Sequence, residues 1–209
     1  MCCRYLLEES PELRPIIEEM NRSPLAGKFF PHAALRSSGE IRPSEVAPVV
    51  APDRAGRRAV FPMKWGFSGK CPIFNARVET ASSRPMFRDS WQSRRCAVPA
   101  SCYFEWEHLL SPDGRKKTGV KYRLQQDSSL TWLCGLYRIE EGLPCFVILT
   151  REPGENIRFI HDRMPLILPE SAVGDWICPD ARPEHLLSLA QTDLLFRPYS
   201  SGSTIAQMM

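Results

Sequence analysis

Hydrophobic and polar positions follow a helical period near the start of the chain. Four apolar residues recur there at the spacing of one helix face: Leu13, Ile16, Ile17 and Met20. Glutamates occupy the opposite face, Ser10 is a suitable N-cap, and Pro11 suits the first turn. The pattern therefore predicts an amphipathic helix over residues 10–21.

From residue 40 onward the pattern changes to short apolar runs that proline and glycine interrupt, which is typical of strands and turns. These runs predict strands at 46–51, 59–62, 95–99, 102–106, 120–124, 130–137 and 145–150. Further apolar spacing predicts helices at 155–159, 169–177 and 183–191. Residues 111–118 (SPDGRKKT) are expected to form an exposed hairpin loop between two of the strands.

These elements favour one α+β domain that covers residues 1–209. Nineteen prolines make up about 9% of the chain, against a usual value near 5%, and fit a loop-rich fold of short strands better than a helical bundle. The length is sufficient to bury a core without disulfides.

The composition is that of a soluble globular protein, with 43% hydrophobic and 24% charged residues. The apolar runs fall short of the roughly 20 residues that a membrane span needs, so no membrane insertion is expected. Glutamates interrupt the first twenty residues, where a signal peptide would be apolar, and a cytoplasmic location is predicted. The eight cysteines form no CxxC pair, so we expect reduced thiols, no bound metal and no cofactor.

Charge is distributed unevenly, although the formal net charge is only +3. Residues 54–95 contain ten basic and two acidic residues, a net charge of +8, which leaves about −5 for the rest of the chain. This distribution predicts one basic face of the kind that nucleic-acid binders present, with scattered solvated arginines as the alternative.

Cys2 is the first candidate for chemistry. Removal of Met1 would leave a cysteine with both a free α-amine and a thiol. The amine titrates near roughly 8 and the thiol near roughly 8.5 in unperturbed peptides, so both reactive forms are accessible at physiological pH. Such a 1,2-aminothiol can condense with an aldehyde and close a thiazolidine; an unreactive terminal cysteine is the alternative.

Two internal segments supply an amide, a guanidinium and a carboxylate. In FNARVET, Asn75 can orient a backbone or a substrate hydroxyl and Arg77 suits phosphate, unless Asn75 simply ends a strand. In CYFEW, Glu105 lies in an aromatic strand, where lost solvation would raise its pKa and suit proton transfer. An exposed strand glutamate is the alternative.

A third segment, IHDRMP, supplies a group that titrates near neutral pH. His161 suits proton transfer, and Arg163 two residues later would point the same way on an extended chain and bind an anion. A structural histidine is the alternative. The other three histidines have no comparable setting and are assigned no role: His32, His108 and His185.

Six short motifs occur in order over most of the chain: MC at 1–2, EIRP at 40–43, WGF at 65–67, NARVET at 75–80, FEW at 104–106 and HDRMP at 161–165. Together they resemble the SOS-response-associated peptidase family, the abasic-site processing proteins. The ordered set is far more specific than any single motif.

The resemblance implies a single α+β domain with a distorted antiparallel β-barrel-like core and flanking helices. It implies a monomer with a basic groove for single-stranded DNA, and covalent capture of abasic sites in the SOS response to DNA damage. Cys2 would be the nucleophile, and Asn75 would position the terminal residue and the sugar. Glu105 would exchange protons with the α-amine, and His161 would act on the opened sugar. Phosphate contacts are expected from Arg4, Arg77, Arg84, Thr150 and Arg163.

The chain departs from the family pattern at two places. Cys3 stands where members usually have glycine, and residues 68–72 (SGKCP) replace a tryptophan-rich wedge, which leaves Phe67 as a substitute stacking surface. Two other functions stay open. One is an N-terminal-nucleophile cysteine peptidase, including one that cleaves only before Cys2, and the other is a non-catalytic module that binds single-stranded DNA.

Overall fold

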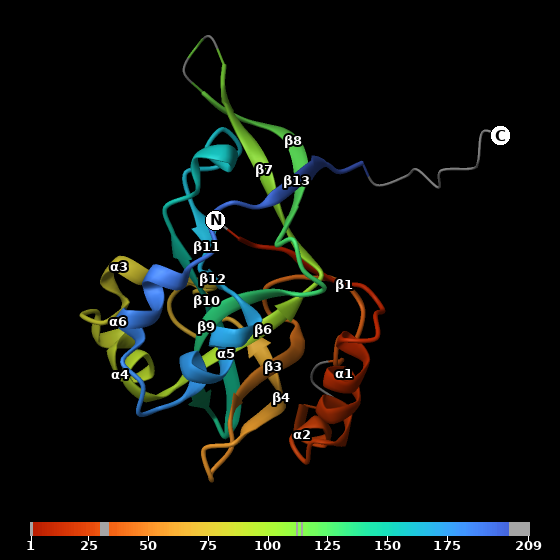
Figure 1. Ribbon diagram of the computed structural model, residues 1–209, viewed down its shortest axis with the longest axis vertical. Helices are drawn as coiled ribbons and strands as arrows, with labels where there is room; N and C mark the ends of the chain where they lie inside the picture. The colour runs from red at the N-terminus through yellow and green to blue at the C-terminus, as the bar shows by residue number, and fades with distance from the viewer. Residues whose placement is uncertain (1, 30–33, 112, 114, 201–209) are drawn as a thin grey trace, which may run out of the picture.

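The computed structural model describes the chain except for residues 1, 30–33, 112, 114 and 201–209 (Figure 1). The protein is an α+β domain with two β-sheets and flanking helices. The predicted fold class is confirmed. None of the helices in the described part of the chain is long and apolar enough to span a membrane.

A closed β-barrel forms the core of the molecule. Its five strands are β3 (Val46–Pro52), β4 (Arg58–Trp65), β6 (Arg95–Ala100), β9 (Thr131–Glu140) and β10 (Leu143–Arg151). They pair in the order β10-β4-β3-β6-β9, and the pairing of β9 with β10 closes the ring. All pairs are antiparallel except β10 with β4, which is parallel, so the barrel departs from a purely antiparallel one at this pair.

Gly135 allows the wall of the barrel to close at β9. It lies opposite Cys96 of β6 on one side and Ile148 of β10 on the other. A Cβ atom here would lie 2.7 Å from the carbonyl oxygen of Val147 and 3.0 Å from the Cys96 sulfur. Because real Cβ contacts are longer than this, the close approach requires a residue without a side chain.

A second sheet joins one end of the barrel. Its order is β13 (Leu195–Pro198), β8 (Lys116–Gln125), β7 (Cys102–Leu110), β1 (Tyr5–Leu7) and β2 (Gly39–Ile41). Only Ser101 separates β6 from β7, so one segment of chain passes from the barrel into this sheet. Figure 1 shows the β7–β8 hairpin extending away from the barrel with β13 beside it.

Three short strands extend the barrel sheet. β5 (Asn75–Arg77) runs parallel to β10, while β11 (Met164–Pro165) pairs with β10 and β12 (Ile167–Leu168) pairs with β9. β10 therefore pairs with both β5 and β11. This pairing brings the NARVET and HDRMP motifs together.

Helices cover the outside of the barrel. They are α1 (Leu13–Arg22), α2 (Ala26–Phe29), α3 (Val78–Ala81), α4 (Pro85–Ser93), α5 (Glu170–Ile177) and α6 (Pro183–Leu186). In Figure 1, α1 and α2 lie on one side of the barrel and α3, α4 and α6 lie on the other. α1 packs on β3 and β4, and α5 packs on β6.

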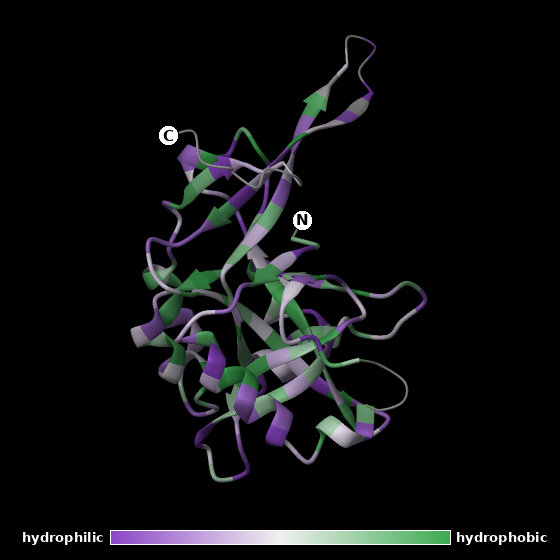
Figure 2. Ribbon diagram, turned by 90° about the vertical axis from the view of Figure 1, so that its right-hand side faces the viewer, coloured by the Kyte–Doolittle hydropathy of each residue, from purple (hydrophilic) through white to green (hydrophobic). Residues whose placement is uncertain are grey.

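The apolar runs of the sequence correspond to strands that are covered on both faces. All six residues of β6 are buried, since one face looks into the barrel and α5 covers the other. α1 buries only Leu13, Ile16 and Met20. In Figure 2 the barrel strands are mostly hydrophobic, whereas the outer parts of the helices and many loops are hydrophilic.

Arg95 fixes the helices on the barrel. This residue is fully buried, and its guanidinium donates hydrogen bonds to five backbone carbonyls: Trp91, Gln92, Trp176, Cys178 and Ala181. These carbonyls lie at the C-terminal ends of α4 and α5 and in the loop after α5, where helices leave acceptors without internal partners. Arg95 therefore joins two helices and a strand.

The expectation that residues 54–95 present one basic face is wrong. Arg95 is buried, and Arg54 and Arg57 lie in the turn between β3 and β4, at the lower end of the barrel in Figure 1. Arg77 and Arg84 are exposed beside β5 and α4. The segment contains the barrel strand β4 and the helices α3 and α4, so its charges are distributed over several parts of the molecule.

All seven predicted strands and the helix at 10–21 are confirmed, the latter with the Ser10 hydroxyl accepting the Leu13 N–H at 3.1 Å. The expected helix at 155–159 is wrong, because only a 3₁₀ turn (Glu155–Ile157) forms. Its buried anchors, Ile157 and Ile160, are three residues apart, a spacing that suits such a turn. In place of the expected helix at 183–191, the short helix α6 and a 3₁₀ turn form. Residues 112 and 114 of the expected hairpin loop at 111–118 lie outside the described residues.

Candidate active site

The N-terminal segment continues β1 alongside β7. Tyr5 lies opposite Tyr103, and the N–H of Phe104 donates to the carbonyl of Arg4 at 2.9 Å. This antiparallel path carries Cys2 toward the next part of β7. Cys2 is fully buried, and its sulfur lies 3.9 Å from the carbonyl oxygen of Arg4.

Asn75 holds this segment from the other side. Its side-chain amide donates to the carbonyl of Cys2 at 2.9 Å. The backbone that carries Asn75 is fixed in turn, since the carbonyl of Phe74 accepts the indole N–H of Trp65 at 2.9 Å and the backbone N–H of Ile148 at 3.0 Å. The WGF and NARVET motifs thus act together to position residue 2.

Glu105 lies on β7 close to Cys2. Its side chain is only 4% exposed, and burial raises the pKa of its carboxyl group. Burial also raises the pKa of the Cys2 thiol well above its usual value, and the negative charge of Glu105 adds to that rise. The two groups therefore share one low-dielectric environment, in which the thiol is held neutral.

His161 follows the 3₁₀ turn and lies near the outer end of β7, where the N–H of His108 donates to the carbonyl of Ile160 at 3.1 Å. The His161 ring is 7% exposed, and its Nδ1 accepts the backbone N–H of Arg163 at 2.9 Å. A carboxylate oxygen of Asp162 lies 2.7 Å from the same nitrogen and stabilises the protonated ring. His161 is therefore held in place through its Nδ1 atom.

His108 lies beside His161, although its sequence context predicts no role for it. Its ring lies 4.1 Å from that of His161, centroid to centroid. Strict alternation from Glu105 would place residue 108 on the opposite face of β7, but a β-bulge between Trp106 and His108 shifts the register. No period in the sequence reports such a bulge.

One group of side chains in the described part of the chain can hold a metal ion. The donor atoms of His108, His161 and Asp162 lie within 4.8 Å of one another. Two imidazoles and a carboxylate are ligands that suit Zn²⁺.

A basic cavity of about 920 Å³ opens next to Asn75. Arg77 and Arg84 line it, as does Arg138 from β9, which the sequence reading did not include. The backbone of 73–77 and the start of α4 complete its walls. The cavity therefore joins three guanidinium groups to the segment that holds Cys2.

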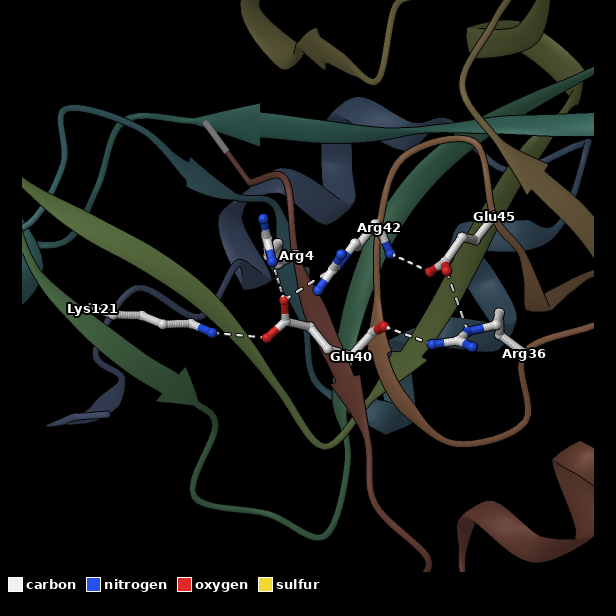
Figure 3. A network of polar contacts seen from close by, with 6 residues as sticks. All are labelled: Arg4, Arg36, Glu40, Arg42, Glu45 and Lys121. Atoms are coloured by element: carbon white, nitrogen blue, oxygen red, sulfur yellow. Dashed lines mark hydrogen bonds and ion pairs between the residues drawn. The ribbon is translucent and has the colours of Figure 1, made fainter. Parts of the chain in front are cut away.

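Arg4 and Arg163, also expected to bind phosphate, are paired with carboxylates. Arg4 bonds Glu40, which also accepts from Lys121 at 2.8 Å (Figure 3). Burial alone would raise the pKa of Glu40, but the bonds from Lys121 and Arg4 outweigh it and hold that pKa below its usual value. Arg163 donates to both oxygens of Glu79 at 2.8 Å and to the carbonyl of Thr150 at 2.7 Å.

Two further residues that were expected to contact DNA, Thr150 and Phe67, are buried. Thr150 is fully buried and its hydroxyl donates to the carbonyl of Ala76 at 3.4 Å, which ties β10 to β5. Phe67, the substitute stacking surface, is fully buried as well, between Phe87 and the guanidinium of Arg138. The expectation for Phe67 is therefore wrong, because a ring inside the core offers no face to a base.

Comparison with known proteins gives one consistent result. The family model described as SOS response associated peptidase (SRAP) matches residues 1–203. The abasic site processing protein YoqW of Bacillus subtilis is 32% identical over 205 residues, which cover 91% of this chain and 87% of YoqW. The abasic site processing protein YedK of Escherichia coli is 32% identical over 122 residues, 56% of this chain and 54% of YedK.

Solved structures share the fold. A protein from Bacteroides thetaiotaomicron superposes with a TM-score of 0.71 at 18% identity, over 96% of this chain and 93% of that one. A phage-related protein from Bordetella bronchiseptica gives 0.70 at 22% identity, over 95% and 94%. At these identities the similarity shows a shared arrangement of strands and helices and nothing beyond the fold.

Proposed function

This chain belongs to the SOS response associated peptidase (SRAP) family, and from that membership we propose that it captures abasic sites in single-stranded DNA through a covalent bond to Cys2. Its relatives YoqW and YedK are named abasic site processing proteins. In this proposal residues 1–209 form one abasic-site processing domain that acts as a monomer in the response to DNA damage.

The observation that carries the proposal is the hydrogen bond from Asn75 to the carbonyl of Cys2, made beside the buried carboxyl of Glu105. The donor to this buried carbonyl is the side-chain amide of a residue on β5 and not a backbone N–H of a paired strand. Asn75 fixes the backbone of residue 2, so the α-amine exposed by removal of Met1 has a defined direction. Fixed geometry of this kind lowers the entropic barrier of a condensation.

The chemistry has two steps and releases one water. The Cys2 amine attacks the C1′ aldehyde of the ring-opened abasic sugar, and the aldehyde oxygen leaves as water with the two amine protons, which gives an imine. The thiol then adds across the C=N bond, so that sulfur bonds to C1′ and the thiol proton goes to nitrogen. The product is a thiazolidine, and the two reaction steps need no oxidant and no metal.

Glu105 and His161 move the protons in this scheme. Glu105 accepts a proton from the attacking amine, a task suited to a carboxyl group whose pKa burial has raised. His161 protonates the departing oxygen and assists ring opening, and its Nδ1 contacts with Arg163 and Asp162 fix the position of the ring. The raised pKa of the thiol favours attack by the amine first, followed by ring closure through sulfur.

The cavity beside Asn75 is the proposed path of the DNA backbone. Arg77 and Arg84 supply positive charge next to Asn75, Arg138 is paired with Glu140, and single-stranded DNA carries one phosphate for each nucleotide. Arg4 and Arg163 would join this path if phosphates replace their carboxylate partners. Thr150 would contribute indirectly, by holding β5 in register with β10.

Incubation of processed protein with an oligonucleotide that contains one abasic site tests the proposal on a denaturing gel. We expect a shifted, denaturant-resistant band for the wild type and for Cys3→Ala, and no such band for Cys2→Ala. Equal bands for the Cys2 and Cys3 variants would refute the assignment of the nucleophile. Absence of a band with the processed wild type would refute covalent capture.

A cysteine peptidase, at least one that cleaves before Cys2, is the second candidate, and the name of the family model favours it. That reaction requires attack by the Cys2 sulfur as a thiolate, which the raised pKa of the thiol disfavours. Intact masses of Asn75→Ala and Glu105→Gln decide the matter. Retention of Met1 in these variants alone would favour self-cleavage over ordinary methionine removal.

A non-catalytic module for single-stranded DNA is the third candidate. The basic cavity favours it, since that cavity needs no reaction to bind phosphate. Salt-sensitive binding that persists in Cys2→Ala, together with no covalent product from the wild type, would support it.

A further inference from the structure

Three aromatic side chains form a cluster on the surface beside the candidate active site. Tyr122 of β8 lies 5.6 Å from Phe159 and 6.1 Å from Phe196 of β13, and the two phenylalanines are 5.5 Å apart, all measured between ring centroids. The rings meet edge to face. Phe159 is 50% exposed and Phe196 is 40% exposed.

The strand register places this aromatic cluster on the same face of the sheet as Glu105. Tyr122 lies directly opposite Glu105 in the β7–β8 pair, and Phe196 lies opposite Leu124, two residues further along β8. Side chains of directly opposed residues share a face, and so do residues two apart on one strand. Phe159, which lies two residues before His161 and just after the 3₁₀ turn, reaches the same face.

The exposure of these rings is not explained by the fold. Large apolar side chains with this exposure in the described part of the chain include only two aromatic ones, Phe159 and Phe196, and these two touch each other. Trp106 is half-buried, and Arg4 and Lys121 lie over its ring. Aromatic residues left in contact on a surface next to a reactive centre suggest a flat ligand.

A DNA strand in the basic cavity needs such a surface at its other end. An abasic nucleotide has no base of its own to stack, so the neighbouring bases must supply the contact that orients the strand. The cavity offers guanidinium groups beside Asn75, but its one aromatic lining residue, Phe87, is buried. Phe67 is buried too. The aromatic cluster lies on the Glu105 and His161 side, where the cavity offers no ring.

We propose that Tyr122, Phe159 and Phe196 form a base-stacking platform that binds the nucleotide next to the abasic site. This proposal rests on the proposed function for the identity of the ligand. A strand would then run from the arginines of the basic cavity, past Cys2, to the aromatic cluster. Stacking on a ring is tolerant of base identity, so the platform orients the strand without selecting a sequence.

The test uses oligonucleotides that carry the fluorescent base 2-aminopurine, in the Cys2→Ala background, where covalent capture cannot occur. Binding of an oligonucleotide with 2-aminopurine beside an uncleaved abasic analogue should quench its fluorescence, because stacking on an aromatic ring does so. Phe159→Ala and Phe196→Ala should each lose most of this quenching and bind about 5- to 20-fold more weakly, at an unchanged salt slope. Ile139→Ala removes an equally exposed apolar side chain from β9 and serves as the matched control.

Quenching that is equal in Phe159→Ala, Phe196→Ala and the Ile139 control would overturn the proposal. So would a concentration-dependent dimer of the wild type that both phenylalanine variants abolish, since the aromatic cluster would then bind a second copy of the chain. Failure of the proposed function gives a different result. A wild type without covalent capture can still show the quenching, which would assign the platform to a module that binds single-stranded DNA.

Discussion

At the scale of single residues, the amide of Asn75 and the carboxyl of Glu105 act on Cys2 from two sides. Asn75 fixes the backbone of residue 2 through a hydrogen bond of 2.9 Å, and Glu105 shares its buried surroundings. Cys3 differs from Cys2 in its burial, because Cys3 is only half-buried. Burial of residue 2 beside a carboxyl group separates its role from that of the neighbouring cysteine.

Asn75→Asp replaces the donor to the Cys2 carbonyl by an acceptor of nearly the same shape. We expect the rate of covalent capture to fall about tenfold or more, which corresponds to about 1.4 kcal/mol or more of lost positioning energy. The measurement is a single-turnover time course with excess protein. Asn21→Asp changes an exposed residue of α1 and should leave the rate unaltered; a normal rate in the residue 75 variant would contradict the positioning role.

Glu105→Gln tests the raised pKa of the buried carboxyl. A folded-state pKa above the unfolded one gives stability that is present below about pH 4.5 and is lost as pH rises through the folded value. The amide cannot ionise, so the variant should melt about 2–4 °C above the wild type near pH 8 and show no such gain near pH 4. Glu152→Gln, an exposed change, is the control for thermal melts across this range. A gain at acid pH alone would contradict the sign.

At the scale of elements, the site depends on where β7 leaves the barrel and where it bulges. The apolar runs of the sequence predict this strand and the other barrel strands, because strands covered on both faces need continuous apolar side chains. The runs do not predict α4 (Pro85–Ser93), because one of its three buried residues is the polar Ser90. They also do not predict β13, whose four residues are all exposed and which forms by pairing with β8.

The candidate site divides in the same way. The sequence predicts Cys2 from its position after Met1, and Asn75, Glu105 and His161 from the polar residue that each motif carries. His108 and Arg138 were not found. His108 reaches His161 only through a bulge, and Arg138 reaches the cavity only because the barrel closes between β9 and β10. Contacts of this kind depend on tertiary register, which a single sequence does not report.

Arg95→Met tests the junction of α4, α5 and the barrel. The variant leaves several buried carbonyls without donors, at about 1–3 kcal/mol each, so unfolding free energy should fall by about 3 kcal/mol or more. Urea denaturation measures the loss, and Arg95→Lys should recover little because an ammonium group cannot span the acceptors. Arg94→Met, one residue away and exposed, is the matched control. Equal stabilities of the two methionine variants would refute the junction.

For the whole molecule, the positions of the charged residues bear on DNA binding more than the net charge of the chain does. The segment of +8 contributes one buried arginine, two arginines at the far turn of the barrel and two at the cavity beside Cys2. In the proposed arrangement a strand would run from the cavity on one side of the candidate site to the aromatic cluster on the other. Phosphates and bases would be bound by different ends of that path.

Arg84→Ser tests the phosphate end. Loss of one contact to a single strand should reduce the slope of log affinity against log salt by about 0.7. Fluorescence anisotropy with an intact oligonucleotide, titrated at several salt concentrations, measures the slope. Arg57→Ser removes an exposed arginine from the turn between β3 and β4 and should leave the slope unchanged. Equal slopes for the two variants would remove the cavity from the DNA path.

We propose that the amine and thiol of Cys2 together capture the abasic sugar. Intact-mass spectrometry of the protein after incubation with an abasic oligonucleotide tests this capture. We expect an adduct whose mass equals the protein without Met1 plus the oligonucleotide minus one water, formed by Cys3→Ala and absent from Cys2→Ala. An adduct that retains Met1, or a processed wild type that forms no adduct, would contradict it.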